Sequence, residues 1–175
     1  MSGRDLPKIR LETPALGHCT EFLAAVHASR ELHRRWITLP TTPAAYRRYL
    51  KKLSGPRFVG HFVRTLDGGL AGGININEIV RGLFKSGYLG YYGFEPYTGQ
   101  GLMSAGLSAV VRRAFGRHHL HRLEANIQPD NLGSINLVRR LGFRCEGLSR
   151  RYLKVCGRWR DHERWAILAE DFRNR

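Results

Sequence analysis

The chain of 175 residues has few cysteines, few acidic residues and no long apolar run. Its three cysteines, Cys19, Cys145 and Cys156, cannot form a fully paired disulfide framework, so we expect free thiols in a reducing compartment. No apolar run reaches the ~18 residues that a membrane-spanning helix needs, and the amino terminus does not resemble a signal peptide. These absences predict a cytoplasmic protein with no membrane partner.

Repeats, low-complexity tracts and linkers are also missing from the chain. The residues are 42% hydrophobic and 25% charged, which is ordinary for a globular protein. A chain of this length can bury most of its apolar surface in one unit. We therefore expect a single domain over residues 1–175, with a core from about residue 8 to about residue 170.

Acidic residues are outnumbered two to one: 14 Asp and Glu stand against 29 Lys and Arg, for a formal net charge of +15. Such a surface attracts polyanions. A solvated basic surface, or a basic wall for a phosphate-rich cofactor, would explain part of the excess. Because a cofactor needs only a few charges, we favour an anionic macromolecular neighbour, with RNA first.

Two glycines lie between a predicted strand and a predicted helix. Residues 87–94 have the pattern of a short buried strand, which Glu95-Pro96 ends because proline cannot donate to a sheet. Residues 102–115 carry apolar residues at helical spacing. Between them, Gly99 and Gly101 allow a tight turn onto the positive, unpaired N–H end of the helix. Such a turn is typical of a cradle for a phosphate or pyrophosphate.

Hydrophobic spacing and turn residues predict the remaining elements. We expect strands at residues 8–13, 58–66, 70–79, 121–128 and 164–168, and helices at 18–32, 44–53 and 134–141. Residues 143–155 are predicted to form two pieces of strand, followed by a turn at Cys156-Gly157. The predicted order is β-α-α-β-β-β-α-β-α-β-β, a mixed α/β fold class.

A second motif follows the glycine-rich turn by about thirty residues: Asn131-Leu-Gly-Ser134, and then Leu141-Gly-Phe143. With residues 97–103, this motif resembles the acyl-CoA-binding segments of the GCN5-related N-acetyltransferases (GNAT). That family has Gln/Arg-x-x-Gly-x-Gly/Ala, and later Asn-x-x-Ser/Ala and Leu-Gly-Phe. Residues 80–82, 88–91 and 157–162 are similar to its ribosomal-protein-alanine N-acetyltransferase (RimJ/RimL-type) branch.

The resemblance implies the GNAT fold, with a splay between the two central strands, and acetyl-CoA as acetyl donor without a metal. It implies cofactor contacts from Phe94, Gly99, Gln100, Gly101, Leu102, Met103, Ser104, Asn126 and Asn131. Thr98 stands where the family has Gln or Arg, and Met103 where it has Gly or Ala. Both glycines of the cradle are retained.

Acetyl transfer to an amine also needs an acid for the departing thiolate and a route for the amine proton. Many relatives carry a tyrosine acid at the position of Val138, so Ser134, one turn earlier, is the predicted acid. Glu78 and Glu124 are the candidate bases. Water alone is the alternative, because an α-amine with a pKa of about 7.7–8.0 is already partly neutral.

Two other sets of titratable residues lie outside these motifs. Asp161 and His162 are neighbours on a predicted strand, so they point to opposite faces. One of them is expected to face the acceptor cleft or to fix the last strand. The histidines at 118, 119 and 121 lack the cysteine or carboxylate that would complete a metal site.

Three functions remain open. The leading one is acetyl-CoA-dependent acetylation of the N-terminal α-amine of a ribosomal protein, by direct amine attack in a ternary complex, with the enzyme a monomer or homodimer. The second acetylates a small amine such as a polyamine or aminoglycoside, which the positive charge disfavours. The third is a ribosome- or RNA-binding assembly factor with weak catalysis. The predicted contact with ribosomal RNA is a basic cluster formed by Arg34, Arg35, Arg47, Arg48, Lys51 and Lys52.

Overall fold

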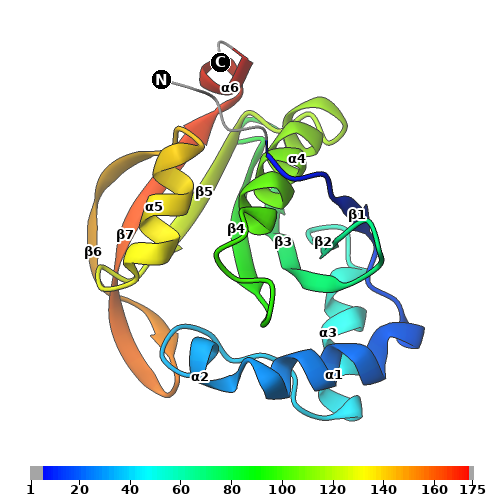
Figure 1. Cartoon of the computed structure of the whole chain (residues 1–175). Coiled ribbons are helices and arrows are strands. Elements are labelled where there is room, and N and C mark those ends of the chain that lie inside the picture. The colour runs from blue at the N-terminus through cyan, green and yellow to red at the C-terminus, as the bar shows by residue number, and fades with distance from the viewer. Residues whose placement is uncertain (1–5, 174–175) are drawn as a thin grey trace.

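A single mixed sheet runs through residues 6–173, the part of the chain that the computed structural model describes (Figure 1). Its strand order is β1-β2-β3-β4-β5-β7-β6. The strands are β1 (Arg10–Glu12), β2 (Val59–Arg64), β3 (Leu70–Val80), β4 (Ser86–Gly93), β5 (Arg122–Ile127), β6 (Arg144–Val155) and β7 (Arg158–Leu168). Neighbours are antiparallel except for the central pair β4 and β5. The predicted α/β class is confirmed, while the ends of the expected domain, residues 1–5 and 174–175, lie outside the described residues.

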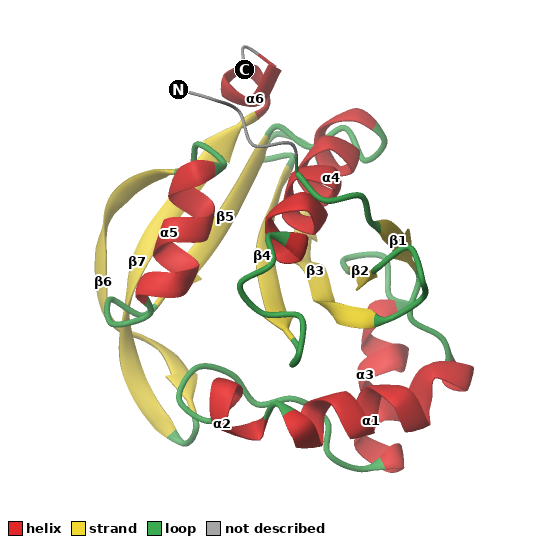
Figure 2. Ribbon diagram, in the orientation of Figure 1, coloured by secondary structure: helices red, strands yellow, loops and turns green. Residues whose placement is uncertain are grey.

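Helices cover both faces of this sheet (Figure 2). They are α1 (Cys19–Ala28), which follows a short 3-10 turn at Leu16–His18, α2 (Arg30–His33), α3 (Pro43–Leu53), α4 (Leu102–Gly116), α5 (Leu132–Arg140) and α6 (Ala169–Arg173). The single helix predicted over residues 18–32 is wrong, because it breaks at Ser29. That buried hydroxyl accepts a hydrogen bond from the Glu95 backbone N–H at 2.9 Å, a tertiary contact that outweighs local helix propensity. Among residues 6–173, no helix is both long and apolar enough to cross a membrane.

The two C-terminal strands form one long hairpin. The prediction of two pieces over residues 143–155 is wrong: β6 is continuous and absorbs its irregularities in two register shifts, at 145–148 and 149–153. The expected turn at Cys156-Gly157 is present, but β7 begins at Arg158 rather than Arg164. Most residues near this turn are exposed, so they lack the apolar alternation by which a half-buried strand is recognised.

Neighbouring residues of the inner strands divide between two apolar cores, because successive side chains point to opposite faces. Val63 and Ala71 belong to the core beneath α4 and α5, whereas Phe62 and Leu70 belong to the core beneath α1 and α3. The second core is aromatic. Within it the fully buried Phe22 lies 4.9–6.2 Å, ring centre to ring centre, from Tyr46, Tyr49, Phe62, Tyr92 and Phe94.

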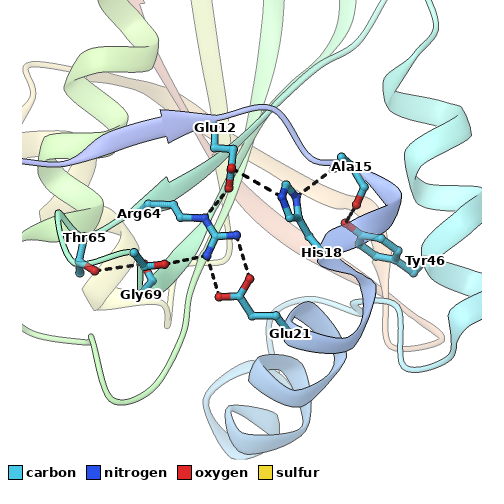
Figure 3. Close-up of polar contacts among 9 residues, drawn as sticks. Glu12, Ala15, His18, Glu21, Tyr46, Arg64, Thr65 and Gly69 are labelled. Carbon is cyan, nitrogen blue, oxygen red and sulfur yellow. Dashed lines mark hydrogen bonds and ion pairs between the residues drawn. The ribbon is translucent and has the colours of Figure 1, made fainter.

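A buried arginine fixes α1 against the edge of the sheet (Figure 3). Arg64 of β2 donates to both carboxylate oxygens of Glu21 on α1, at 2.7 and 2.8 Å, and to Glu12 on β1. This pairing lowers the pKa of Glu12. The chain continues from α1 into α2 and then into residues 34–42. The ion pairs of Arg64 therefore also help to position those residues.

Candidate active site

The sheet opens between its two parallel strands. β4 and β5 pair only through Ser86–Tyr88 and Arg122–Glu124, and beyond these residues they diverge (Figure 1). The opening holds a cavity of about 140 Å³, here called the gap hollow, with Tyr91, Asn126 and His162 in its wall. The splay expected between the central strands is therefore present.

A larger cavity of about 410 Å³, the cradle hollow, lies against the start of α4. Gly99 and Gly101 approach it with φ of 75° and 78°, the left-handed conformation that favours glycine. The first bond of α4 runs from the Ala105 N–H to the Gly101 carbonyl at 3.0 Å. The N–H groups of residues 102–104 therefore precede the helical bonding pattern and are suited to an anion.

The two hollows share part of their walls. Tyr91 of β4, Asn131 and Ser134 at the start of α5, and Trp36 and Ile37 of the α2–α3 loop (residues 34–42) line both. A ligand seated on the cradle can therefore extend along this shared wall into the gap between the strands.

The α2–α3 loop bridges the opening from one half of the sheet to the other. The Arg34 carbonyl accepts a hydrogen bond from the Cys156 thiol at 3.3 Å, and the Arg35 carbonyl accepts one from the Gln128 amide at 3.4 Å. These contacts join the loop to the β6–β7 turn and to the end of β5. They hold Trp36 beside both hollows.

Two hydroxyl groups meet in the shared wall. The hydroxyls of Tyr91 and Ser134 hydrogen-bond each other at 2.5 Å. Burial raises the pKa of Tyr91 to about 12, against an opposing effect of the Ser134 hydrogen bond, so its phenol is protonated at neutral pH. Ser134 is fixed in turn by Asn131, the N-cap of α5, whose side chain accepts from the Ser134 backbone N–H at 3.2 Å. Both hydroxyls therefore carry a proton at the junction of the hollows.

The sequence-predicted cofactor residues divide into those that line a hollow and those that do not. Gly99, Gly101, Leu102, Met103, Ser104 and Asn131 line the cradle hollow, and Asn126 lines the gap hollow. The Asn126 Oδ1 atom is buried without a hydrogen-bond partner among the described residues. Phe94 is instead fully buried in the aromatic core, and the Gln100 amide turns back to the Pro96 carbonyl at 2.9 Å.

The two candidate carboxylate bases line neither hollow. Glu78 is exposed and pairs with Arg57 at 3.4 Å, and Glu124 accepts from Arg122 at 2.9 Å. Within residues 6–173, no cluster of three or more His, Cys, Asp or Glu side chains is arranged to hold a metal.

Two residues of the site, Tyr91 and Trp36, were not predicted from the sequence, whereas His162 was one of two candidates for the acceptor cleft. Tyr91 belongs to the matched segment 88–91 and His162 to the segment 157–162. The prediction that Asp161 and His162 face opposite ways agrees with the structure. Asp161 is exposed and accepts from the Arg151 backbone N–H, whereas His162 is 3% exposed and lines the gap hollow. Trp36 had no signal beyond its position in an irregular basic segment.

The family model of the acetyltransferase (GNAT) domain matches residues 8–144 of the chain. The chain belongs to the GNAT acetyltransferase family. A GNAT relative in Escherichia coli, the [ribosomal protein uS5]-alanine N-acetyltransferase, is 40% identical over 103 residues, which are 59% of this chain and 53% of the relative. The chain thus spans about half the length of that curated relative.

Solved GNAT structures share the whole fold. Mycobacterium smegmatis RimJ in complex with a CoA disulfide superimposes with a TM-score of 0.87 at 26% identity, over 94% of this chain and 83% of RimJ. A spermidine N-acetyltransferase from Vibrio cholerae reaches 0.78 at 17% identity, over 95% and 96% of the two chains. At that identity the likeness concerns the fold alone. The GNAT fold predicted from the sequence is confirmed.

Proposed function

We propose that this protein is an acetyl-CoA-dependent N-acetyltransferase that modifies the N-terminal α-amine of a ribosomal protein. The observation that carries the proposal is the meeting of the two hollows at Tyr91 and Ser134. One hollow has an anion cradle suited to a pyrophosphate, and the other opens between the strands. Donor and acceptor can therefore be bound together, with their reacting ends beside a proton source.

Direct attack by the amine in a ternary complex fits this arrangement. None of the three cysteines lines either hollow, so no thiol is available there to carry an acetyl group. Bound acetyl-CoA would supply the thioester that activates the acetyl group. The cradle residues 99–104 would hold its pyrophosphate with backbone N–H groups, and Asn131 and Asn126 would contact the pantetheine arm.

Ser134 is proposed as the acid for the departing thiolate, acting together with Tyr91. Val138, where many relatives have tyrosine, cannot donate a proton. Tyr91 enters the same space from β4, and the 2.5 Å hydrogen bond makes the two hydroxyls one donor unit. The sequence suggested Glu78 as a carboxylate base. To act as one, Glu78 would have to leave Arg57 and reach the gap hollow.

The charges near the opening favour an acceptor that arrives on an anionic surface. Arg158 and Arg160 lie on β7 at two-residue spacing from His162, hence on the same face as that residue of the gap hollow. Neither forms an ion pair among the described residues. A free polyamine would be repelled here, whereas a ribosomal protein whose N-terminus lies beside RNA phosphates would not.

The basic cluster predicted to meet RNA divides into two parts. Arg34 pairs with Glu31 at 2.9 Å and Arg35 with Asp130 at 4.0 Å. The cations of α3, by contrast, form no ion pair among the described residues: Arg47, Arg48, Lys51 and Lys52. We therefore assign the proposed RNA contact to α3.

Intact-mass spectrometry of ribosomal proteins after incubation with the enzyme and acetyl-CoA tests the proposed acceptor. One ribosomal protein should gain a single acetyl group, and peptide sequencing should place it on the N-terminal residue. Modification of spermidine without modification of any ribosomal protein would overturn the proposal.

Charge reversal on α3 tests the RNA contact. Acetylation of the ribosome-bound substrate should fall steeply with added salt, because each phosphate contact releases a counterion. Changing Arg47, Arg48, Lys51 and Lys52 to Glu should remove much of that reaction and its salt dependence. The same variant with a free N-terminal peptide is the matched control, and its rate should hold. Equal salt dependence of both substrates would exclude α3 as an RNA contact.

A further inference from the structure

The two hollows contain few groups that could accept a proton from an amine. Among their lining residues, the titratable ones are His33, Tyr91, Tyr92, Tyr97, Arg140 and His162. No aspartate or glutamate lines either hollow. Arginine and protonated tyrosine are not bases near neutral pH. Any side-chain base in this space must therefore be one of the two histidines.

His33 is not available for this task. Its Nε2 atom lies 2.8 Å from the Gly93 carbonyl, which can only accept, so the ring proton is on Nε2. The other nitrogen, Nδ1, holds the lone pair but is buried without a partner among the described residues. An acceptor amine cannot reach an enclosed atom, so His33 is a structural residue that ties α2 to β4.

His162 has the opposite arrangement. Its Nδ1 atom lies 3.0 Å from the Arg160 carbonyl and must donate to it, which leaves the lone pair on Nε2. Within residues 6–173, Nε2 has no hydrogen-bond partner, and it is not among the enclosed unpartnered atoms. Because the residue lines the gap hollow and Nε2 is not enclosed, we infer that Nε2 faces that space.

The surroundings keep this imidazole neutral. Burial lowers the pKa of His162, and the Arg160 carbonyl and the Asp161 carboxylate oppose that effect only in part. From β6, the Tyr152 ring lies 6.3 Å away, centre to centre. From β4, β5 and α5, the hollow receives Tyr91, Asn126 and Ser134, none of them charged at neutral pH. A neutral histidine with an open lone pair is a competent general base.

We propose that His162 Nε2 takes the proton from the acceptor amine during acetyl transfer, an inference that rests on the proposed function. As the amine nitrogen bonds to the thioester carbonyl carbon, its proton passes to Nε2. The carbon–sulfur bond breaks, and the sulfur takes a proton from the Tyr91–Ser134 pair. The imidazolium then releases its proton to water and the hydroxyl pair regains one, so that amine and thioester become amide and thiol.

The tautomer can be measured without turnover. In ¹⁵N-histidine-labelled protein at neutral pH, the His162 signal, assigned by its loss in His162→Gln, should show Nδ1 protonated and Nε2 unprotonated. It should titrate below the ordinary histidine range. A proton on Nε2, or a charged ring at pH 7, would overturn the inference.

Kinetics supply the second readout. His162→Gln keeps a polar group near Nε2 but has no basic nitrogen, and His162→Asn keeps a donor for the Arg160 carbonyl. Both should lower kcat by roughly 100-fold with little change in the affinity for acetyl-CoA. Both should also lose the acidic limb of the kcat–pH profile that His162 causes. His121→Gln is the matched control, because His121 is exposed and lies beside Glu170 at the start of β5.

The outcomes separate this inference from the proposed function. A wild-type protein that acetylates no amine would refute the proposed function. An active wild-type protein whose His162 variants keep the rate and the acidic limb would refute the role of His162 alone. If both variants unfold, the His162 signal of the wild-type protein is assigned instead by through-bond correlation to its backbone, and its titration still decides whether a neutral Nε2 exists.

Discussion

The two halves of the site are built in different ways. The cradle half is made of consecutive backbone: the turn at Gly99 and Gly101 and the first N–H groups of α4. The gap half is made of side chains from five separate places, with Trp36, Tyr91 and His162 brought together by the sheet and the α2–α3 loop. In the proposed mechanism a local motif holds the donor, whereas the chemistry depends on residues that tertiary folding brings together.

This difference predicts where substitutions act. Changes in the cradle should alter donor binding, because backbone N–H groups make no proton transfer. Changes in the gap should alter turnover while the donor still binds. The free energy of unfolding of the sheet and its helices should depend on pH through buried histidines such as His61, which lines neither hollow.

The largest effect on ligand binding is expected at Gly101. Gly101→Val places a branched side chain at φ 78° where a phosphate must approach the backbone. We expect the affinity for acetyl-CoA to fall by roughly 100-fold, equivalent to about 2.8 kcal/mol, in titration calorimetry. Gly82→Val is the control, since Gly82 has φ 66° in the β3–β4 turn and should impose similar strain without loss of binding. Unchanged affinity for acetyl-CoA in Gly101→Val would show that the pyrophosphate does not bind at this turn.

The next effect is expected at the hydroxyl pair. Ser134→Ala and Tyr91→Phe should each lower kcat by roughly 100-fold with a smaller effect on donor binding. The double variant should be little worse than either single one, because the two groups act as a unit. Ser108→Ala, on the far part of α4, serves as the control. Additive losses in the double variant would mean that the two hydroxyls act separately.

A third prediction concerns the scaffold under α4. Burial lowers the pKa of His61 to about 4, reinforced by Arg113, His118 and Arg117. The unfolded chain, with a histidine pKa near 6.5, then binds more protons than the folded one between pH 6.5 and 4. Stability therefore falls as pH falls through this window, by up to about 3 kcal/mol.

Urea unfolding at pH 7 and at pH 4.5 measures this loss. His61→Leu should flatten the dependence, with the remaining slope due to other buried histidines such as His33. An identical slope in wild type and variant would contradict the assignment. If low pH reduces activity without reducing the free energy of unfolding, the titrating group lies in the gap half of the site rather than at His61.

The smallest effect is expected at Glu78. Its carboxylate is exposed, is paired with Arg57 and lines neither hollow. Glu78→Gln should therefore leave kcat and its pH profile close to those of wild type. A large fall in kcat would restore the sequence-based hypothesis that Glu78 is the base.

Sequence reasoning reached the parts of the molecule that local pattern determines. The turn at Gly99 and Gly101, the cap at Asn131 and the order of the strands follow from short-range geometry and from the family resemblance. It failed where tertiary packing determines the direction and the partners of a side chain. Phe94 was expected beside the ligand, but its side chain points into the aromatic core. The partnership of Tyr91 with Ser134 joins residues 43 positions apart, and no periodicity in the chain indicates it.

The narrow pairing between β4 and β5 has a consequence for how the site comes into being. Strands β1 to β4 are drawn from residues 10–93, and strands β5 to β7 from residues 122–168. Each leaf of the sheet is thus one continuous piece of chain, and synthesis completes the first before the second begins. Tyr91 belongs to the earlier leaf, whereas Ser134 and His162 arrive with the later one. A nascent chain therefore contains the turn at Gly99 and Gly101 before it contains Ser134 and His162, and the wall of the gap hollow is complete only when the second leaf has joined the first.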